Sequence, residues 1–357
     1  MNTFTTILIA VLTFGILILI HEFGHYIFAR IFHVTIKEFS IGMGPKLFWY
    51  DSKKTGIRYT IAALPIGGFV SMAGEDGESN DPNSFDKKPA WQRFIITAAG
   101  ATINILAGFL AMAILCSIPS NDGKTPLGST VVHSFEQSDQ LTHSSAEYGL
   151  RVGDKILEVN GKNVTILDEL SYEIMRHGDA PIDLLVERTV NEKKEVVLLE
   201  DVVFPTAVEQ EQTFGQMDFK VWGVEQSFGS VLSYAFQKSV LIVRMCWESL
   251  FDLITGRYTL AAVSGPVGIS SAIGDAAERG ISPLLYIVAL ISINLGVMNL
   301  LPIPALDGGR LLCLLIEMIT RKKLPAKVES LIHGIGLILL LGFSVVIMFK
   351  DIFQLLF

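Results

Sequence analysis

Residues 4–28 read FTTILIAVLTFGILILIHEFGHYIF, an apolar run that ends in a short cluster of ionisable side chains. The run is long enough to cross about 30 Å of hydrocarbon as an α-helix. No Lys or Arg precedes it and no small-residue cleavage pattern follows it, which argues against a secretory signal. We therefore interpret it as a retained membrane helix.

Further apolar runs of spanning length follow along the chain. Hydrophobic residues make up 50% of the 357 positions and charged residues only 18%, which is typical of a protein surrounded by a lipid bilayer. The net charge of −8 gives no indication of nucleic-acid binding. The three cysteines all lie in apolar segments, so neither a disulfide framework nor a thiolate metal site is expected. The predicted fold class is a multi-pass α-helical membrane protein, with transmembrane helices at residues 1–30, 94–118, 283–310 and 330–350.

Basic residues predict the orientation of these helices, because positively charged loops stay in the cytosol. Nine Lys or Arg lie within residues 30–93 and five within residues 310–327, whereas none precedes the first helix. The N-terminus and the acidic region between the second and third helices are therefore expected outside the cytosol. Within residues 231–254 the charged side chains fall on one arc of a helical wheel, so we expect an amphipathic surface helix at residues 226–258.

Two other regions have strand patterns. Residues 31–93, on the cytosolic side, contain β-forming runs separated by turn residues, and they predict a small membrane-associated β-sheet whose last strand is kinked by Pro65, Gly67 and Gly68. Residues 125–206 alternate strand-like runs with turns, including the hairpin signal Asn160-Gly161. They predict one small extracytoplasmic α/β domain.

The sharpest motif is His21-Glu22-Phe23-Gly24-His25 at the inner end of the first helix. Residues four apart share a helix face, so both imidazoles can bind one metal ion while Glu22 accepts a proton from a water on that ion. Ionisable groups inside a membrane are costly unless they are paired or bind something. The alternative interpretation is an interfacial cluster whose side chains only reach toward water.

Two histidines leave a catalytic zinc ion one protein ligand short. Asp307 supplies a carboxylate after the third helix, where Pro302 and Pro304 interrupt the apolar run and Gly308 and Gly309 permit a tight turn. It reaches the depth of the histidines only if the third helix runs in the same direction as the first, as it does when residues 226–258 lie on the surface. The alternative role for Asp307 is to cap an ordinary turn.

These motifs together resemble the site-2 protease family of intramembrane zinc metalloproteases, and within it the bacterial regulator of sigma-E protease branch. The resemblance is carried by His21-Glu22-x-x-His25, by Gly100-x-x-x-Asn104, by the run Ser264-Gly265-Pro266-Val267-Gly268-Ile269, and by residues 299–309. It implies that Zn²⁺ is held by His21, His25 and Asp307, that Glu22 is the general base, and that Asn294 or Asn299 holds the substrate backbone. The predicted sheet looks like the family's membrane-dipping β-loop, whose edge strand pairs with an extended substrate, so Gly67 and Gly68 are further candidate substrate-binding residues.

The outer domain resembles a PDZ domain, on the string GLRVGDKILEVNG at residues 149–161. The chain has room for a single such domain, whereas some family members carry two in tandem. The resemblance implies regulated cleavage of single-pass membrane proteins, such as anti-sigma factors or remnant signal peptides, in a bacterial cytoplasmic membrane, and a peptide ligand for the PDZ domain. The alternatives are a membrane metal-binding protein or transporter without proteolysis, and a PDZ scaffold protein.

Overall fold

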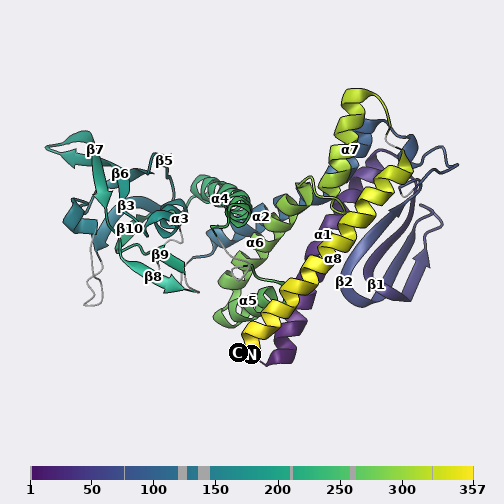
Figure 1. Ribbon diagram of the computed structural model, residues 1–357, viewed down its shortest axis with the longest axis horizontal. Helices are drawn as coiled ribbons and strands as arrows, with labels where there is room; N and C mark the ends of the chain where they lie inside the picture. The colour runs from purple at the N-terminus through teal and green to yellow at the C-terminus, as the bar shows by residue number, and fades with distance from the viewer. Residues whose placement is uncertain are drawn as a thin grey trace. The chain divides into compact units, whose positions relative to one another are not determined.

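The computed structural model describes residues 2–75, 77–119, 127–135, 145–209, 212–257, 263–323 and 325–356. The chain divides into two compact units (Figure 1). Unit 1 comprises residues 1–111 and 242–357, and unit 2 comprises residues 112–241. Two helices, α2 (Ala90–Ser117) and α4 (Phe228–Thr255), pass from one unit into the other.

Four helices among the described residues are long and apolar enough to cross a membrane. They are α1 (Thr3–Ile31), α2, α6 (Ile281–Leu300) and α8 (Ala326–Leu356), and in α8 the apolar segment is Lys327–Phe353. The prediction of four spanning helices is confirmed at the level of length and composition. Within the described part of the chain α4 does not meet these criteria, and its place at a membrane surface stays a prediction.

Glycines let α2 and α6, two of these apolar helices, pack closely in unit 1. An added Cβ at Gly108 of α2 would come within 2.9 Å of the Ala289 carbonyl oxygen, and one at Gly296 of α6 would come within 2.7 Å of the Ala101 carbonyl oxygen. Small residues at such crossings allow two helix backbones to approach, which is a principal source of helix association in lipid. The α2 and α6 backbones are therefore closely packed against each other, beside α1.

The third predicted span, residues 283–310, is divided in the structure. Helix α6 ends at Leu300, a turn follows, and a separate helix α7 (Asp307–Thr320) begins at Asp307. Pro302 and Pro304 cause the break, because proline lacks the N–H that a continuing helix needs. A further helix that the sequence did not predict, α5 (Pro266–Arg279), precedes α6 and has proline in its first turn.

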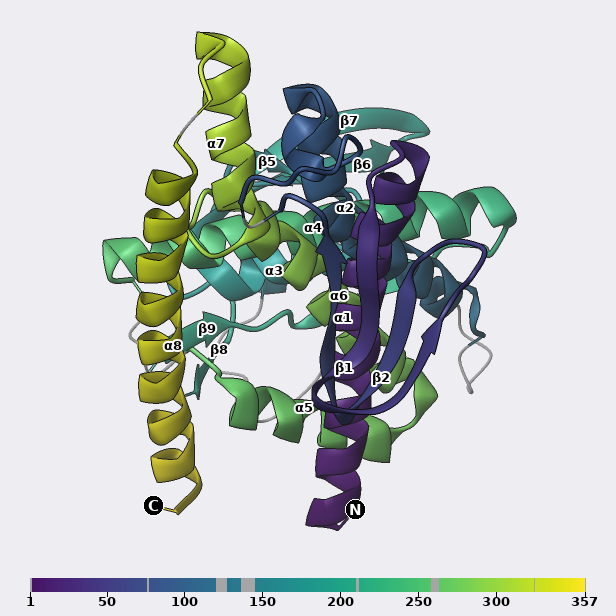
Figure 2. The same cartoon turned by 90° about the vertical axis from the view of Figure 1, so that its right-hand side faces the viewer.

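A β-sheet of unit 1 lies alongside α1 (Figure 2). It is built from two long bent strands, β1 (Ile36–Asp51) and β2 (Arg58–Met72), and the short 3₁₀ helix η1 (Phe85–Lys87) follows them. Residues 36–41 pair with residues 68–72 on one side and with residues 58–61 on the other, and residues 46–51 pair with residues 58–62. The expected kink in the last strand is present, with Gly67 at a φ of 86° that favours glycine. Residues 68–72 consequently form one edge of the sheet.

Unit 2 holds an antiparallel sheet in the order β10-β3-β4-β6-β7, with β5 paired to β4 and a separate β8-β9 hairpin. Leu170 and Ile174 of the helix α3 (Leu167–His177) join the apolar core. The sheet continues beyond the predicted boundary at residue 206, because β10 pairs with β3. The strands are β3 (Gly128–Phe135), β4 (Lys155–Val159), β5 (Lys162–Asn163), β6 (Ile182–Val190), β7 (Lys193–Val202), β8 (Thr206–Glu209), β9 (Gln212–Gly215) and β10 (Phe219–Gly223), and the 3₁₀ helix η2 (Ser145–Tyr148) follows β3.

Candidate metal centre

Two imidazoles project from one face of α1. His21 and His25 lie one helical turn apart, and their Nε2 atoms are 3.2 Å from each other. Gly24 lies between them in sequence and faces α2, where an added Cβ would come within 2.6 Å of the Ala99 carbonyl oxygen. This close approach brings α2 against the turn of α1 that carries the histidines. His21 is only 8% exposed, and His25 and Asp307 are partly buried.

Asp307 reaches the same point from the first turn of α7. The chain folds back tightly before it, and a side chain at Gly308 would collide with the Leu301 carbonyl oxygen. Ala305 in this turn has a φ of 78°, and its N–H donates a 3.0 Å hydrogen bond to Nδ1 of His333 on α8. The close approach at Gly308 and the hydrogen bond to His333 therefore fix the turn. The Asp307 carboxylate consequently lies at the start of a helix, where a negative charge is favoured.

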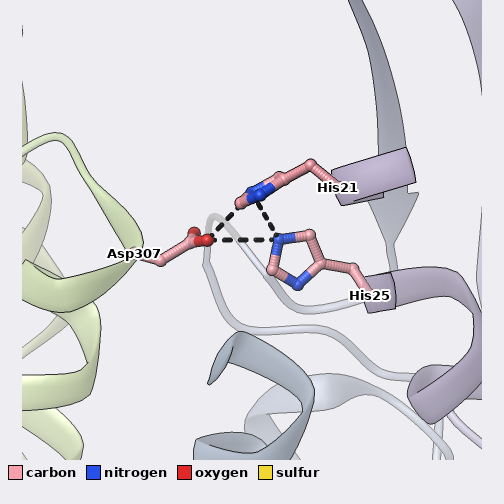
Figure 3. A group of neighbouring side chains, drawn as sticks. All are labelled: His21, His25 and Asp307. Atoms are coloured by element: carbon pink, nitrogen blue, oxygen red, sulfur yellow. Dashed lines mark hydrogen bonds and ion pairs between the residues drawn. The ribbon is translucent and has the colours of Figure 1, made fainter. Parts of the chain in front are cut away.

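The three side chains meet in a geometry that fits a single metal ion (Figure 3). Oδ2 of Asp307 lies 3.0 Å from Nε2 of His21 and 3.3 Å from Nε2 of His25. Ligand atoms that are about 2.0–2.1 Å from a tetrahedral zinc ion stand roughly 3.3 Å apart, so the observed spacing matches that ion. The expectation that the third predicted helix runs in the same direction as the first is consistent with this result, since Asp307 lies beside the histidines.

The donor chemistry of the cluster also fits a cation. Nδ1 of His25 lies 2.8 Å from the Ile96 carbonyl oxygen, which can only accept, so Nδ1 carries the proton and Nε2 keeps a lone pair. Oδ2 of Asp307 is buried and receives no hydrogen bond from the described residues. Burial raises the pKa of a carboxyl group, but the adjacent imidazoles outweigh it and hold the pKa of Asp307 below its ordinary value. An ionised, unsatisfied oxygen facing imidazole nitrogens is well suited to a metal ion.

Helix α2 completes the surroundings of the cluster. Ile96, Gly100 and Asn104 follow each other at intervals of four, so they lie on one face of the helix. An added Cβ at Gly100 would collide with Nε2 of His25 and lie 2.8 Å from Nε2 of His21. Only glycine leaves this space open, and the open space faces both nitrogen atoms.

Glu22 lies next to the cluster and faces the edge of the sheet. Its Oε2 accepts a 3.2 Å hydrogen bond from the N–H of Val70, and its Cγ would be 3.7 Å from a Cβ added at Gly68. Val70 belongs to the edge residues 68–72. Its hydrogen bond to Glu22 shows that its N–H points to α1 and not to the neighbouring strand. The carboxylate that could move a proton is thus beside the backbone groups that could bind an extended peptide.

The structure brings the main predicted residues together and leaves others apart from the cluster. His21, His25 and Asp307 converge as expected, with Glu22 and Gly68 alongside. Asn294 and Asn299 are half-buried on α6, the helix that leads into the Asp307 turn, and Gly67 lies at the bend of β2. The roles of these three residues in substrate binding stay predictions.

Sequence reasoning assigned no individual role at the site to four residues. The backbone N–H of Val70 donates to Glu22, and His333 accepts from the N–H of Ala305 in the turn before Asp307. No local sequence pattern indicates either contact. Gly100 and Asn104 were recognised only as part of a motif. Their spacing of four already places them on one helix face, but which helix that face contacts is a tertiary property.

Comparison with known proteins agrees with this geometry. The sequence profile of peptidase family M50 matches residues 9–343 of the chain. A Fusobacterium nucleatum protein whose name proposes a zinc metalloprotease is 35% identical over 354 residues, which cover 98% of this chain and 99% of the relative. The regulator of sigma-W protease RasP of Bacillus subtilis is 28% identical over 432 residues, which cover 97% and 98% of the two chains. The zinc metalloprotease RasP of Bacillus licheniformis is likewise 28% identical, over 430 residues that cover 97% and 98%.

Proposed function

This chain belongs to peptidase family M50 and is a zinc metalloprotease, and from that premise we propose that it cuts single-pass membrane proteins within or beside the bilayer. The observation that carries the proposal is the convergence of His21 and His25, on a helix of spanning length, with Asp307 at the start of α7. We assign these three residues as the zinc ligands. Because the histidines lie on such a helix, the peptide bond that is cut should lie in the membrane or at its surface.

The chemistry follows from the residues around the ligands. A zinc ion bound there makes a water molecule more acidic and polarises the carbonyl group of the scissile peptide bond. Glu22 takes the proton from the attacking water and later delivers it to the leaving nitrogen. Its position at 3.2 Å from the Val70 N–H keeps the carboxylate beside the sheet edge, where the peptide bond would be held.

Substrate binding is assigned to the edge of the β1–β2 sheet. A transmembrane helix must unwind before its peptide bonds can be attacked, and an unwound segment can add as a strand to residues 68–72. Gly67 and Gly68 lie at the start of this edge of β2. Asn294 and Asn299 lie on α6, before the turn that leads to Asp307. The name of RasP, a regulator of sigma-W protease, supports anti-sigma factors as one substrate class and remnant signal peptides remain a second.

Unit 2 is assigned as a single PDZ domain that restricts access to the site and binds a peptide. The motif at residues 149–161 supports this, because Gly149 and Gly153 have φ values of 97° and 91° in the loop before β4. The distribution of basic residues supports a bacterial cytoplasmic membrane protein with its N-terminus and unit 2 outside the cytosol.

The test compares the wild type with Glu22→Gln, using an epitope-tagged single-pass substrate in a strain that lacks the native gene. Loss of a general base costs about 10²–10⁴-fold in rate, so we expect cleavage to stop within the detection range while zinc content stays at the wild-type level. Glu78→Gln, an exposed change of the same type in the loop after β2, serves as the matched control. Cleavage by Glu22→Gln at the wild-type rate would refute the role of Glu22. No cleavage by the wild type across several substrates would favour a metal-binding or scaffold protein.

A further inference from the structure

Asn104 of α2 is fully buried and points at the metal centre. Its side-chain amide nitrogen, Nδ2, lies 3.4 Å from Nδ1 of His21, the imidazole nitrogen that faces away from Asp307. The other end of the amide, Oδ1, is buried and has no hydrogen-bond partner among the described residues. A buried amide with one end unsatisfied is unusual, because such groups are rarely left without partners.

The amide can be turned so that its oxygen and nitrogen exchange places, since the two ends are nearly the same in shape. With its NH₂ group toward His21, Asn104 would donate to Nδ1 and leave the imidazole proton on Nε2. In that tautomer Nε2, the nitrogen that faces Asp307 and His25, has no lone pair to offer a metal ion. With its oxygen toward His21, Asn104 accepts a hydrogen bond from the protonated Nδ1, and the lone pair of Nε2 is free to bind.

We propose that Asn104 is a positioning residue that accepts a hydrogen bond from Nδ1 of His21 and thereby presents Nε2 to the zinc ion. The inference rests on the zinc site assigned above and extends it to a residue that does not touch the metal. His25 supports it by analogy within the same site, because its Nδ1 lies 2.8 Å from the Ile96 carbonyl oxygen. One face of α2 thus serves both imidazoles, the first with a side chain and the second with a backbone carbonyl.

The placement of Asn104 is itself supported by α6. Oγ of Ser292 donates a 2.8 Å hydrogen bond to the Asn104 backbone carbonyl, and both residues are buried. This contact holds the α2 turn against the helix that leads into the Asp307 turn. Helix α2 thus contacts both histidines, and it is bonded to α6, the helix that precedes Asp307 in the chain. Residues that orient metal ligands are expected to have such an arrangement.

The experiment measures zinc release from the purified full-length protein in detergent, with a chromophoric chelator, for the wild type, Asn104→Asp and Asn104→Leu. Asp keeps an oxygen acceptor at the same position, whereas Leu has a similar size and no polar atom. Loss of a group that orients a ligand weakens metal binding by about 10–100-fold, so we expect that loss for Asn104→Leu and near wild-type retention for Asn104→Asp. A residue that only fills space would give the opposite order, because leucine packs better than a buried carboxylate.

Asn104→Ala, which removes the oxygen without adding volume, keeps the test decisive if the leucine variant does not fold. Visible absorption of the cobalt-substituted proteins supplies a second readout, since a changed His21 geometry shifts the ligand-field bands. Thr102→Ala, at an exposed position of α2, is the control. Equal zinc retention by the wild type, Asn104→Leu and Asn104→Ala would overturn the role of Asn104 alone. Absence of zinc from the wild type would overturn the metal centre and this inference together.

Discussion

Replacing Gly100 with alanine adds one methyl group to the space between the two imidazoles. The new Cβ would lie 2.8 Å from Nε2 of His21 and would collide with Nε2 of His25. Ordinary contacts of a carbon atom are about 3.5 Å, so the methyl group intrudes by roughly 0.7 Å on His21 alone. The backbone of α2 is packed against α1 at Gly24 and cannot retreat without opening that contact.

The expected result is an enzyme that folds but does not hold its zinc. Misplacement of reacting groups by about 1 Å costs on the order of 10²-fold, and we expect at least that loss in cleavage rate together with a comparable loss of zinc affinity. Overpacking by one methyl group lowers the free energy of unfolding by about 1–3 kcal/mol, which a folded membrane domain can tolerate. Three quantities are measured on the same preparations: the zinc content per protein by mass spectrometry, the thermal unfolding in detergent, and the rate of substrate cleavage.

Two other glycines provide the controls. Gly108→Ala lies on the same helix and would place its Cβ 2.9 Å from the Ala289 carbonyl oxygen, so it disturbs packing against α6 and not the metal centre. Gly342→Ala on α8 has no atom within 4 Å of its added Cβ and is expected to be neutral. Full zinc content and wild-type cleavage in Gly100→Ala would refute the assignment of this space to the metal centre. An equal loss of zinc in Gly108→Ala would attribute the effect to unpacking.

Two further predictions concern the sheet edge and unit 2. Gly68→Val would place its Cβ 2.7 Å from the Ser40 carbonyl oxygen and displace the edge strand, so cleavage should fall about 10–100-fold with unchanged zinc content, while Gly77→Val, whose Cβ meets nothing within 4 Å, should cleave normally. Wild-type cleavage by Gly68→Val would remove the edge from the substrate path. Asp154→Ala removes the carboxylate 2.7 Å from the Arg188 guanidinium and leaves that charge with the Gly149 carbonyl oxygen. A buried pair broken on one side costs about 3–5 kcal/mol, so protease sensitivity of unit 2 should rise steeply while zinc content is kept. Unchanged protease sensitivity would contradict the stabilising role of this ion pair.

The membrane helices and the zinc motif could be predicted from the sequence because both depend on local order. Helix length follows from an unbroken apolar run, and the shared face of His21 and His25 follows from their spacing of four. Asp307 was a candidate because two histidines leave a catalytic zinc ion one protein ligand short, and the structure brings its carboxylate to the two histidines. The interruption at Pro302 and Pro304 was expected, but a separate helix α7 from Asp307 was not, because a proline signals a break without telling where the chain resumes a helix.

Only the tertiary structure decided which surfaces face one another. The space at Gly100, the amide of Asn104 near His21, and the N–H of Val70 near Glu22 all join segments that lie far apart in the chain. The extension of the unit 2 sheet to β10 has the same origin, since strand pairing is a contact between distant residues. Periodicity along a chain specifies which side chains share a face. Close packing of one face against another, at the resolution of a single methyl group, decides what that face can bind.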